Sequence, residues 1–183
     1  MIAFFAMAAL SSRAQSLEII PKAGINFARQ QIGNIANEKT KVGFQGGVAV
    51  NIPTGAGLSI QPEINFVNKG SKVKIGEGQQ KLNLNYLEIP VLVKYTFGPL
   101  YVNAGPSIGL LLTRQKDVIE KYGSKLDKVD FGAQMGLGIA IPAGKGKVVV
   151  DGRYYLGFND IGNTTSVRNR GILASVGYAI PLK

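Results

Sequence analysis

The chain of 183 residues contains no cysteine, no histidine and no tryptophan. Without cysteine there is neither a disulfide to stabilise the fold nor a thiol nucleophile. Without histidine a histidine-dependent catalytic triad is excluded, and the absence of both residue types excludes the usual zinc sites. The fold must therefore be stabilised by other means, and we expect neither a metal ion nor a cofactor.

Long hydrophobic runs are also missing, apart from one at the N-terminus. Residues 2–10 form an apolar run of nine residues, which is shorter than the ~20 residues that a membrane-spanning helix needs. Small residues at Ser12 and Ala14 fit cleavage after Ala14, so residues 1–14 are predicted to be an export signal peptide. No lysine or arginine precedes the run, and a buried N-terminal helix is the alternative. The remainder, 15–183, is expected to form one domain.

Beyond residue 15, apolar residues alternate with polar or small ones at a period of two. This period indicates β-strands with two unlike faces. The phase changes near Tyr86, because Leu82 and Leu84 are out of step with the residues that follow, and a β-bulge there would reconcile them. The eight alternating segments are 19–27, 42–52, 58–66, 82–97, 100–110, 129–141, 148–158 and 172–182.

The lengths of these segments and of their connections point to a membrane. Each segment has roughly ten residues, whereas soluble strands usually have ~5–6 and a strand tilted across a bilayer needs ~9–11. Short turns near 53–56, 98–99 and 142–146 alternate with predicted long loops near 28–41, 68–81, 113–128 and 159–170. An even number of long strands, with short turns at one end and long loops at the other, is typical of bacterial outer-membrane barrels.

The two faces of the predicted strands differ in chemistry. One face is uniformly apolar, and the other is rich in glycine, asparagine and glutamine with a few charges. We therefore predict an all-β, eight-stranded, antiparallel up-and-down transmembrane β-barrel in the cell outer membrane, with its apolar face toward lipid. A soluble barrel of the lipocalin kind is the alternative, but its exterior would carry many lysines and glutamates. Closure would pair every backbone group in the hydrocarbon and so stabilise the fold without disulfides.

A small set of charged residues is predicted to point into the barrel. A lumen this narrow is filled by side chains, and buried charges are tolerated when they are paired. We expect an interior network of salt bridges and hydrogen bonds, with inward glycines making room for it. The alternative is a proton or ion path, or a carboxylate pair in acid–base catalysis. The inward charges are Glu63, Glu88, Lys94, Asp130, Asp151 and Arg153.

The net charge is +10, and most of it falls in the predicted long loops. These loops hold 14 of the 21 lysines and arginines against six acidic residues, a net charge of +8. A cationic rim would attract the phosphates of lipopolysaccharide, with screening over ~8 Å at physiological salt; an ordinary solvated surface is the alternative. Nucleic acid is not expected, because no helical motif or aromatic stacking platform accompanies the charge. The candidate lipid or partner contacts are Lys69, Lys72, Lys74, Arg114, Lys116, Lys121, Lys125 and Lys128.

Four segments carry a resemblance to a known family. The most specific is Tyr86–Tyr95 (YLEIPVLVKY), and the others are 105–109 (GPSIG), 131–138 (FGAQMGLG) and 151–157 (DGRYYLG). Together they resemble the PorT-like outer-membrane β-barrel domain family of Bacteroidetes, from about residue 17 to the end of the chain. The resemblance implies an outer-membrane barrel, in a family of which one branch serves protein secretion.

Three functions remain open from the sequence. The preferred one is a non-enzymatic envelope protein whose basic extracellular loops contact surface lipid or protein partners, as an accessory to secretion or to surface interaction. The second is a narrow channel or an outer-membrane enzyme that uses the inward charges. The third is a soluble periplasmic barrel that binds a ligand.

Overall fold

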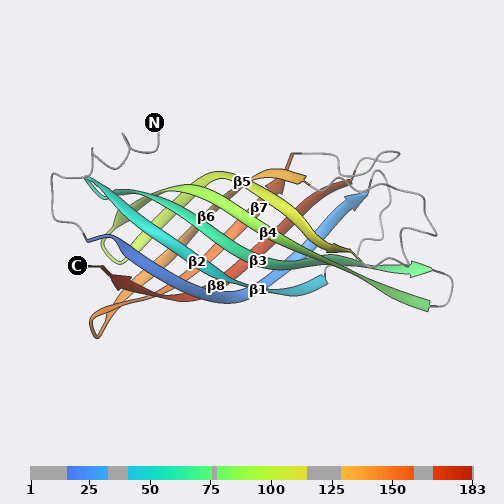
Figure 1. Cartoon of the computed structure of the whole chain (residues 1–183), viewed down its shortest axis with the longest axis horizontal. Coiled ribbons are helices and arrows are strands. Elements are labelled where there is room, and N and C mark those ends of the chain that lie inside the picture. The colour runs from blue at the N-terminus through green and yellow to red at the C-terminus, as the bar shows by residue number, and fades with distance from the viewer. Residues whose placement is uncertain (1–15, 33–40, 76–77, 115–128, 159–166, 183) are drawn as a thin grey trace.

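In the computed structural model the chain forms eight β-strands that close into a barrel (Figure 1). The structure describes residues 16–32, 41–75, 78–114, 129–158 and 167–182, so the predicted signal peptide, 1–14, lies outside the described residues. Each strand pairs antiparallel with the next, and β8 returns to pair with β1. The predicted fold class is confirmed. The strands are β1 (Glu18–Ile32), β2 (Lys41–Gly55), β3 (Leu58–Ile75), β4 (Gly78–Phe97), β5 (Leu100–Arg114), β6 (Val129–Ala143), β7 (Gly146–Gly157) and β8 (Val167–Pro181).

The strands are longer than the alternating segments, from 12 residues in β7 to 20 residues in β4. Alternation in hydropathy marks the portion of a strand that lies between lipid and lumen, whereas backbone pairing continues beyond it. Short turns join β2 to β3, β4 to β5 and β6 to β7, as predicted. In the second turn Gly98 has a φ of 63° and is followed by Pro99, which suits the first central position of a primed hairpin turn.

The prediction of a long loop at 68–81 is wrong. β3 and β4 continue there as a paired hairpin, with Asn68 opposite Asn85 and Ile75 opposite Gly78. This hairpin extends farther than the other strands at the end opposite the short turns (Figure 1). The physical reason is that a hairpin outside the membrane needs no apolar face toward lipid, so the contrast between alternate residues fades while the ladder persists.

The predicted irregularity near Tyr86 is present, but the extra residue lies on the neighbouring strand. β4 keeps an unbroken register with β3 through Leu82, Leu84 and Tyr86. Its register with β5 shifts between Asn85 and Tyr86, which leaves Leu112 as the additional residue of β5. The bulge therefore adjusts β5 to β4 and does not reverse the phase of Leu82 and Leu84.

The outer surface of the barrel is apolar and the interior is polar. Leu137 in the middle of β6 is 67 % exposed, and Phe44, whose ring stacks on that of Phe66 at 5.7 Å between centroids, is 59 % exposed. Asparagine, glutamine, serine and charged side chains are buried inside. An exterior of this kind suits hydrocarbon rather than water. The soluble-barrel alternative does not explain an apolar exterior. Among the described residues, no helix is long and apolar enough to cross a membrane.

Replacing Leu137 by Arg would place a charge in the middle of a lipid-facing strand. We expect L137R to lower the free energy of unfolding by about 2–4 kcal/mol, because a cation at the bilayer midplane costs this much. Leu182→Arg, the same substitution just beyond the end of β8, is the matched control and should cost about 0–1 kcal/mol. Urea unfolding in phosphatidylcholine vesicles, followed by the heat-modifiable gel band, measures both. Equal losses would contradict the orientation of β6.

Candidate functional site

The chemistry-bearing residues of this barrel lie in its lumen. The structure places all six predicted inward charges there, each at most 6 % exposed. It brings three of them together, because Arg153 is in direct contact with both Glu63 and Asp151. The other three, Glu88, Lys94 and Asp130, lie elsewhere in the lumen and are described below.

An ion pair crosses the lumen from wall to wall. Arg153 on β7 donates from Nη1 to Oε2 of Glu63 on β3 and from Nη2 to Oε1, both at 2.9 Å. Three strands separate β3 from β7 in either direction around the barrel, so the two residues project from opposite walls. A bidentate guanidinium–carboxylate pair is strong and directional. Both side chains are almost fully buried, and the pair occupies the middle of the lumen.

Two further charges complete a central cluster, which we define as Lys22, Glu63, Asp151 and Arg153. Lys22 Nζ on β1 donates to Glu63 Oε2 at 2.5 Å. Arg153 Nη2 also donates to Asp151 Oδ2 at 2.7 Å, and Ser175 Oγ donates to Asp151 Oδ1 at 2.8 Å. Two cations therefore face two carboxylates, and the cluster is neutral as a whole. This balance satisfies the requirement that buried charges be paired.

Lys22 belongs to the central cluster but is not among the six predicted inward charges. It stands between Pro21 and Ala23, which are exposed on the lipid side. The period of two in β1 therefore already places Lys22 on the inward face, and this signal was sufficient to find it. The same reasoning applies to Glu18, which is also buried.

Glu63 has its hydrogen-bonding positions filled. Besides Arg153 and Lys22, its carboxylate accepts hydrogen bonds from Gln61 Nε2 at 2.7 Å and from Asn65 Nδ2 at 2.9 Å. An ionised carboxylate offers about four lone-pair positions, and these donors occupy both oxygens. A general acid or base must be reachable by the proton that it transfers. The geometry of Glu63 therefore suits a structural crosslink rather than catalysis.

Two glycines of β6 make room for long side chains from neighbouring strands. A Cβ atom at Gly136 would lie 2.6 Å from Cγ of Arg153, and one at Gly138 would lie 2.3 Å from the ring of Tyr101. Both distances are far below ordinary van der Waals contact. The prediction that inward glycines make room for the interior network is confirmed at these positions.

Glu88 and Asp130 belong to a second polar group on the loop side of the central cluster. Glu88 Oε2 accepts a hydrogen bond from Gln134 Nε2 at 3.2 Å, and Gln134 also reaches Ser107 Oγ at 3.4 Å. Glu88 and Asp130 are both cross-strand partners of Gly109, so the two carboxylates stand at one level of the barrel. Within the described residues, no group of three or more acidic side chains is arranged to hold a metal ion.

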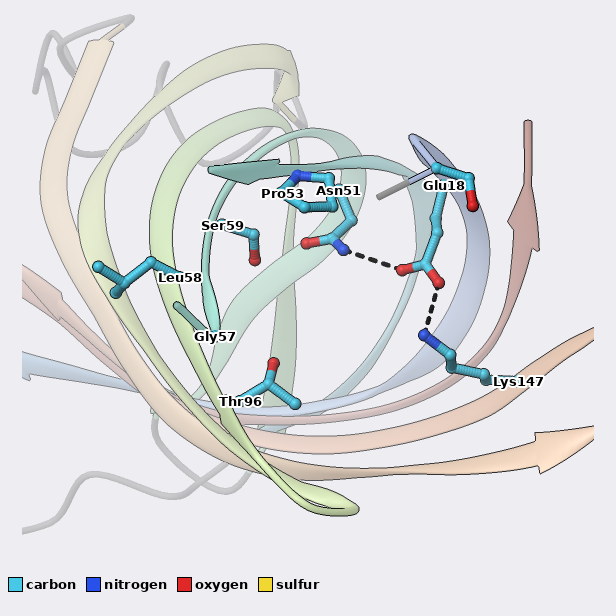
Figure 2. A pocket seen from close by; sticks show the side chains of 9 residues that line it. Glu18, Asn51, Pro53, Gly57, Leu58, Ser59, Thr96 and Lys147 are labelled. Carbon is cyan, nitrogen blue, oxygen red and sulfur yellow. Dashed lines mark hydrogen bonds and ion pairs between the residues drawn. The ribbon is translucent and has the colours of Figure 1, made fainter. Parts of the chain in front are cut away.

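The turn end of the barrel opens into a pocket of about 370 Å³, which we call the mouth pocket (Figure 2). Glu18 lies at one side of it, where its carboxylate accepts from Asn51 Nδ2 at 2.8 Å and pairs with Lys147 Nζ at 2.7 Å. Ser59 and Thr96 also line it. The mouth pocket is polar, and it lies on the side of the central cluster that faces the short turns.

Lys94 lies between the mouth pocket and the central cluster. Its Nζ stands 4.2 Å from the centroid of the Tyr101 ring, which is a cation–π contact. The Tyr101 hydroxyl donates to Asp151 Oδ2 at 3.3 Å, so Tyr101 connects Lys94 to the central cluster. In the part of the chain that the structure describes, no carboxylate forms an ion pair with Lys94.

The predicted lipid or partner contacts lie at the opposite end. Lys69, Lys72 and Lys74 belong to β3 and Arg114 to β5, so these four are strand residues rather than loop residues. Lys72 stands directly opposite Lys81 of β4, which places two lysines side by side on the extended hairpin. The remaining four lie outside the described residues: Lys116, Lys121, Lys125 and Lys128.

Comparisons with known proteins agree on this architecture. Residues 12–163 match the family model described as "Outer membrane protein beta-barrel domain", and no curated protein matches the chain. Ail, the attachment invasion locus protein of Yersinia pestis, solved with the heparin analogue sucrose octasulfate, has a TM-score of 0.53 at 12 % identity, over 91 % of this chain and 100 % of Ail. Neisserial surface protein A has a TM-score of 0.53 at 14 % identity, over 92 % of this chain and 100 % of that protein. At these identities the likeness shows the fold alone.

The central cluster predicts unequal effects of two identical substitutions. Glu63→Gln leaves Arg153 and Lys22 buried beside a neutral side chain, and we expect it to cost about 3–5 kcal/mol of the free energy of unfolding. Glu18→Gln breaks the pair with Lys147, whose side chain is 48 % exposed, and should cost about 1 kcal/mol or less. Urea unfolding, followed by the intensity of the folded band on a gel, measures the free energy of unfolding of both variants. A loss at Glu63 no larger than that at Glu18 would show that the crossing pair does not stabilise the barrel.

Proposed function

The chain belongs to the outer membrane protein β-barrel domain family, and on this premise we propose that it is a sealed, non-enzymatic barrel of the cell outer membrane. It acts through the surfaces that it presents, not by passing solutes or transforming them. The lumen is a structural interior, and the extracellular end makes the contacts. This is the function that the geometry supports best.

One observation carries the sealed-lumen proposal, namely the pair between Glu63 and Arg153 that joins opposite walls at 2.9 Å. Lys22 reaches the same carboxylate from a third strand, so side chains approach the axis from several directions. An eight-stranded barrel has an interior just wide enough to be filled by side chains. The interior charges therefore serve as crosslinks, in preference to the channel and enzyme alternatives.

The charge at the loop end supports a role in contacting anionic surface molecules. Lys72 and Lys74 lie on the hairpin of β3 and β4, and Lys81 is the cross-strand partner of Lys72. A cluster of lysines near an anionic lipid surface is worth about 1 kcal/mol per residue. Lipopolysaccharide, with its phosphates, is the proposed partner. The structure of Ail with a sulfated heparin analogue is consistent with polyanion binding by a barrel of this fold.

Within the family, we place the chain in the PorT-like branch on the segment Tyr86–Tyr95. In β4 this segment supplies two buried, inward-facing charges, Glu88 and Lys94. Under this assignment the extracellular segments would contact proteins of the envelope as an accessory to secretion. Deletion of 113–128 tests it: loss of secretion with an intact heat-modifiable barrel supports the role, and unchanged secretion argues against it.

The sealed lumen predicts an electrical result. Reconstituted in planar bilayers, the wild-type chain should give no steady ion current, because side chains fill the lumen at the central cluster. Removing both partners together, as Glu63→Ala with Arg153→Ala, keeps the net charge of the central cluster at zero, because Lys22 and Asp151 remain, and should raise conductance. The control removes a cation–carboxylate pair at the mouth, Glu18→Ala with Lys147→Ala, and should stay silent. A wild-type current as large as that of the Glu63–Arg153 variant would overturn the proposal.

The lipopolysaccharide proposal predicts that affinity for lipopolysaccharide falls when lysines are replaced at the loop end of the barrel but not at the turn end. Lys72→Gln with Lys74→Gln should weaken binding of purified lipopolysaccharide by about 2 kcal/mol, roughly thirtyfold, because two lysines near the phosphates are lost. Lys145→Gln with Lys147→Gln has the same spacing at the turn end and should leave affinity unchanged. Calorimetric titration of the detergent-solubilised barrel measures both. Equal affinities of the two double variants would refute the placement of the site.

A further inference from the structure

One buried cation in the turn half of the lumen, Lys94, forms no ion pair with a carboxylate of the described residues. Among the described residues, the ion pairs there join Lys22 and Arg153 to Glu63, Arg153 to Asp151, and Lys147 to Glu18. Lys94 is left without such a pair, although it is only 5 % exposed. A buried ammonium group without a counter-ion is costly. The ring of Tyr101 offsets part of this cost, but it supplies no negative charge.

A second buried polar group without partners stands directly beside Lys94. Asn103 on β5 is the cross-strand partner of Lys94 on β4 and is 3 % exposed. Neither its Nδ2 nor its Oδ1 has a hydrogen-bond partner among the residues that the structure describes. Buried amides nearly always have a hydrogen-bond partner in the protein or in ordered water, so the Asn103 side chain offers a donor and an acceptor that the described protein atoms do not use.

Asn103 and Lys94 belong to a row of cross-strand neighbours whose next member lines the mouth pocket. Ser59 on β3 is the cross-strand partner of Lys94 on the other side, and it lines the mouth pocket. Figure 2 shows the Ser59 and Thr96 side chains within the open turn end of the barrel. A molecule that enters this end therefore meets Ser59 first, with Lys94 and Asn103 on the two strands beyond it.

We propose that Ser59, Lys94 and Asn103 form a binding site for the carboxylate or phosphate group of a small molecule that enters from the periplasm. A hydroxyl, an ammonium and an amide N–H are all donors, and together they match the acceptor oxygens of an oxyanion. The mouth pocket, which Ser59 lines, has a volume of about 370 Å³, at the lower end of the ~300–1,000 Å³ that small-molecule sites span. Short turns of outer-membrane barrels face the periplasm. This site is independent of the proposed contacts at the extracellular end.

Nuclear magnetic resonance of the full ¹⁵N-labelled chain in a non-ionic detergent tests the site directly. The side-chain amide of Asn103, identified by its loss in Asn103→Ala, is followed while sodium phosphate or sodium acetate is added. We expect a saturable shift with at least one of the two salts and none with sodium chloride at equal ionic strength. A response to phosphate alone identifies a phosphate ligand, and a response to acetate alone identifies a carboxylate ligand.

Matched lysine variants separate the site from general charge effects. Lys94→Met should weaken binding of the anion at least tenfold, as expected for the loss of one charge-assisted hydrogen bond. Lys145→Met, at an exposed position in the β6–β7 turn that does not line the mouth pocket, should change the affinity less than twofold. If Lys94→Met does not refold, Asn103→Ala replaces it, with binding followed by the Lys94 ammonium resonance. A shift that is linear in salt, equal for chloride, or unchanged in both variants of the site would overturn the proposal.

Discussion

The closed backbone ladder is the constraint on which the rest of this barrel depends. In hydrocarbon an unpaired N–H or C=O group costs several kcal/mol, so the last strand must return to the first. β8 does so along its length, from Glu18 opposite Pro181 to Ile32 opposite Val167. Closing eight strands also sets a narrow interior. Each inward side chain must then fit against its neighbours, which is why Gly136 stands beside Arg153.

The narrow interior in turn decides how the buried charges behave. A carboxylate in a wide aqueous pore can exchange protons and ions, whereas Glu63 meets an arginine from the opposite wall, a lysine from a third strand and two amides. The charged members of the cluster depend on one another for their counter-charges. Such a cluster holds the walls at a set distance, and removal of one member leaves a buried charge uncompensated. The interior chemistry is therefore mainly the chemistry of stability.

The central cluster also divides the barrel into two ends with different chemistry. At the loop end, the long β3–β4 hairpin carries Lys69, Lys72, Lys74 and Lys81. At the turn end, Ser59 lines the mouth pocket, and its neighbours on the next two strands are Lys94 and Asn103. Under our proposals both ends bind anions, the outer one by the clustered charge of the hairpin lysines and the inner one by a few buried donors. The first is sensitive to salt because exposed charges are screened, and the second is less so.

The sequence by itself determined the strands, their two faces and the six inward charges, because alternation is a local property that each strand displays independently. The same alternation also marks Lys22 as inward. It did not determine the hairpin at 68–81, where backbone pairing outlasts the contrast in hydropathy, or the placement of the bulge at Leu112. Above all it did not determine which charges meet. Glu63 and Arg153 are 90 residues apart, and their contact follows from the number of strands and the stagger of the closed sheet, which only the tertiary structure decides.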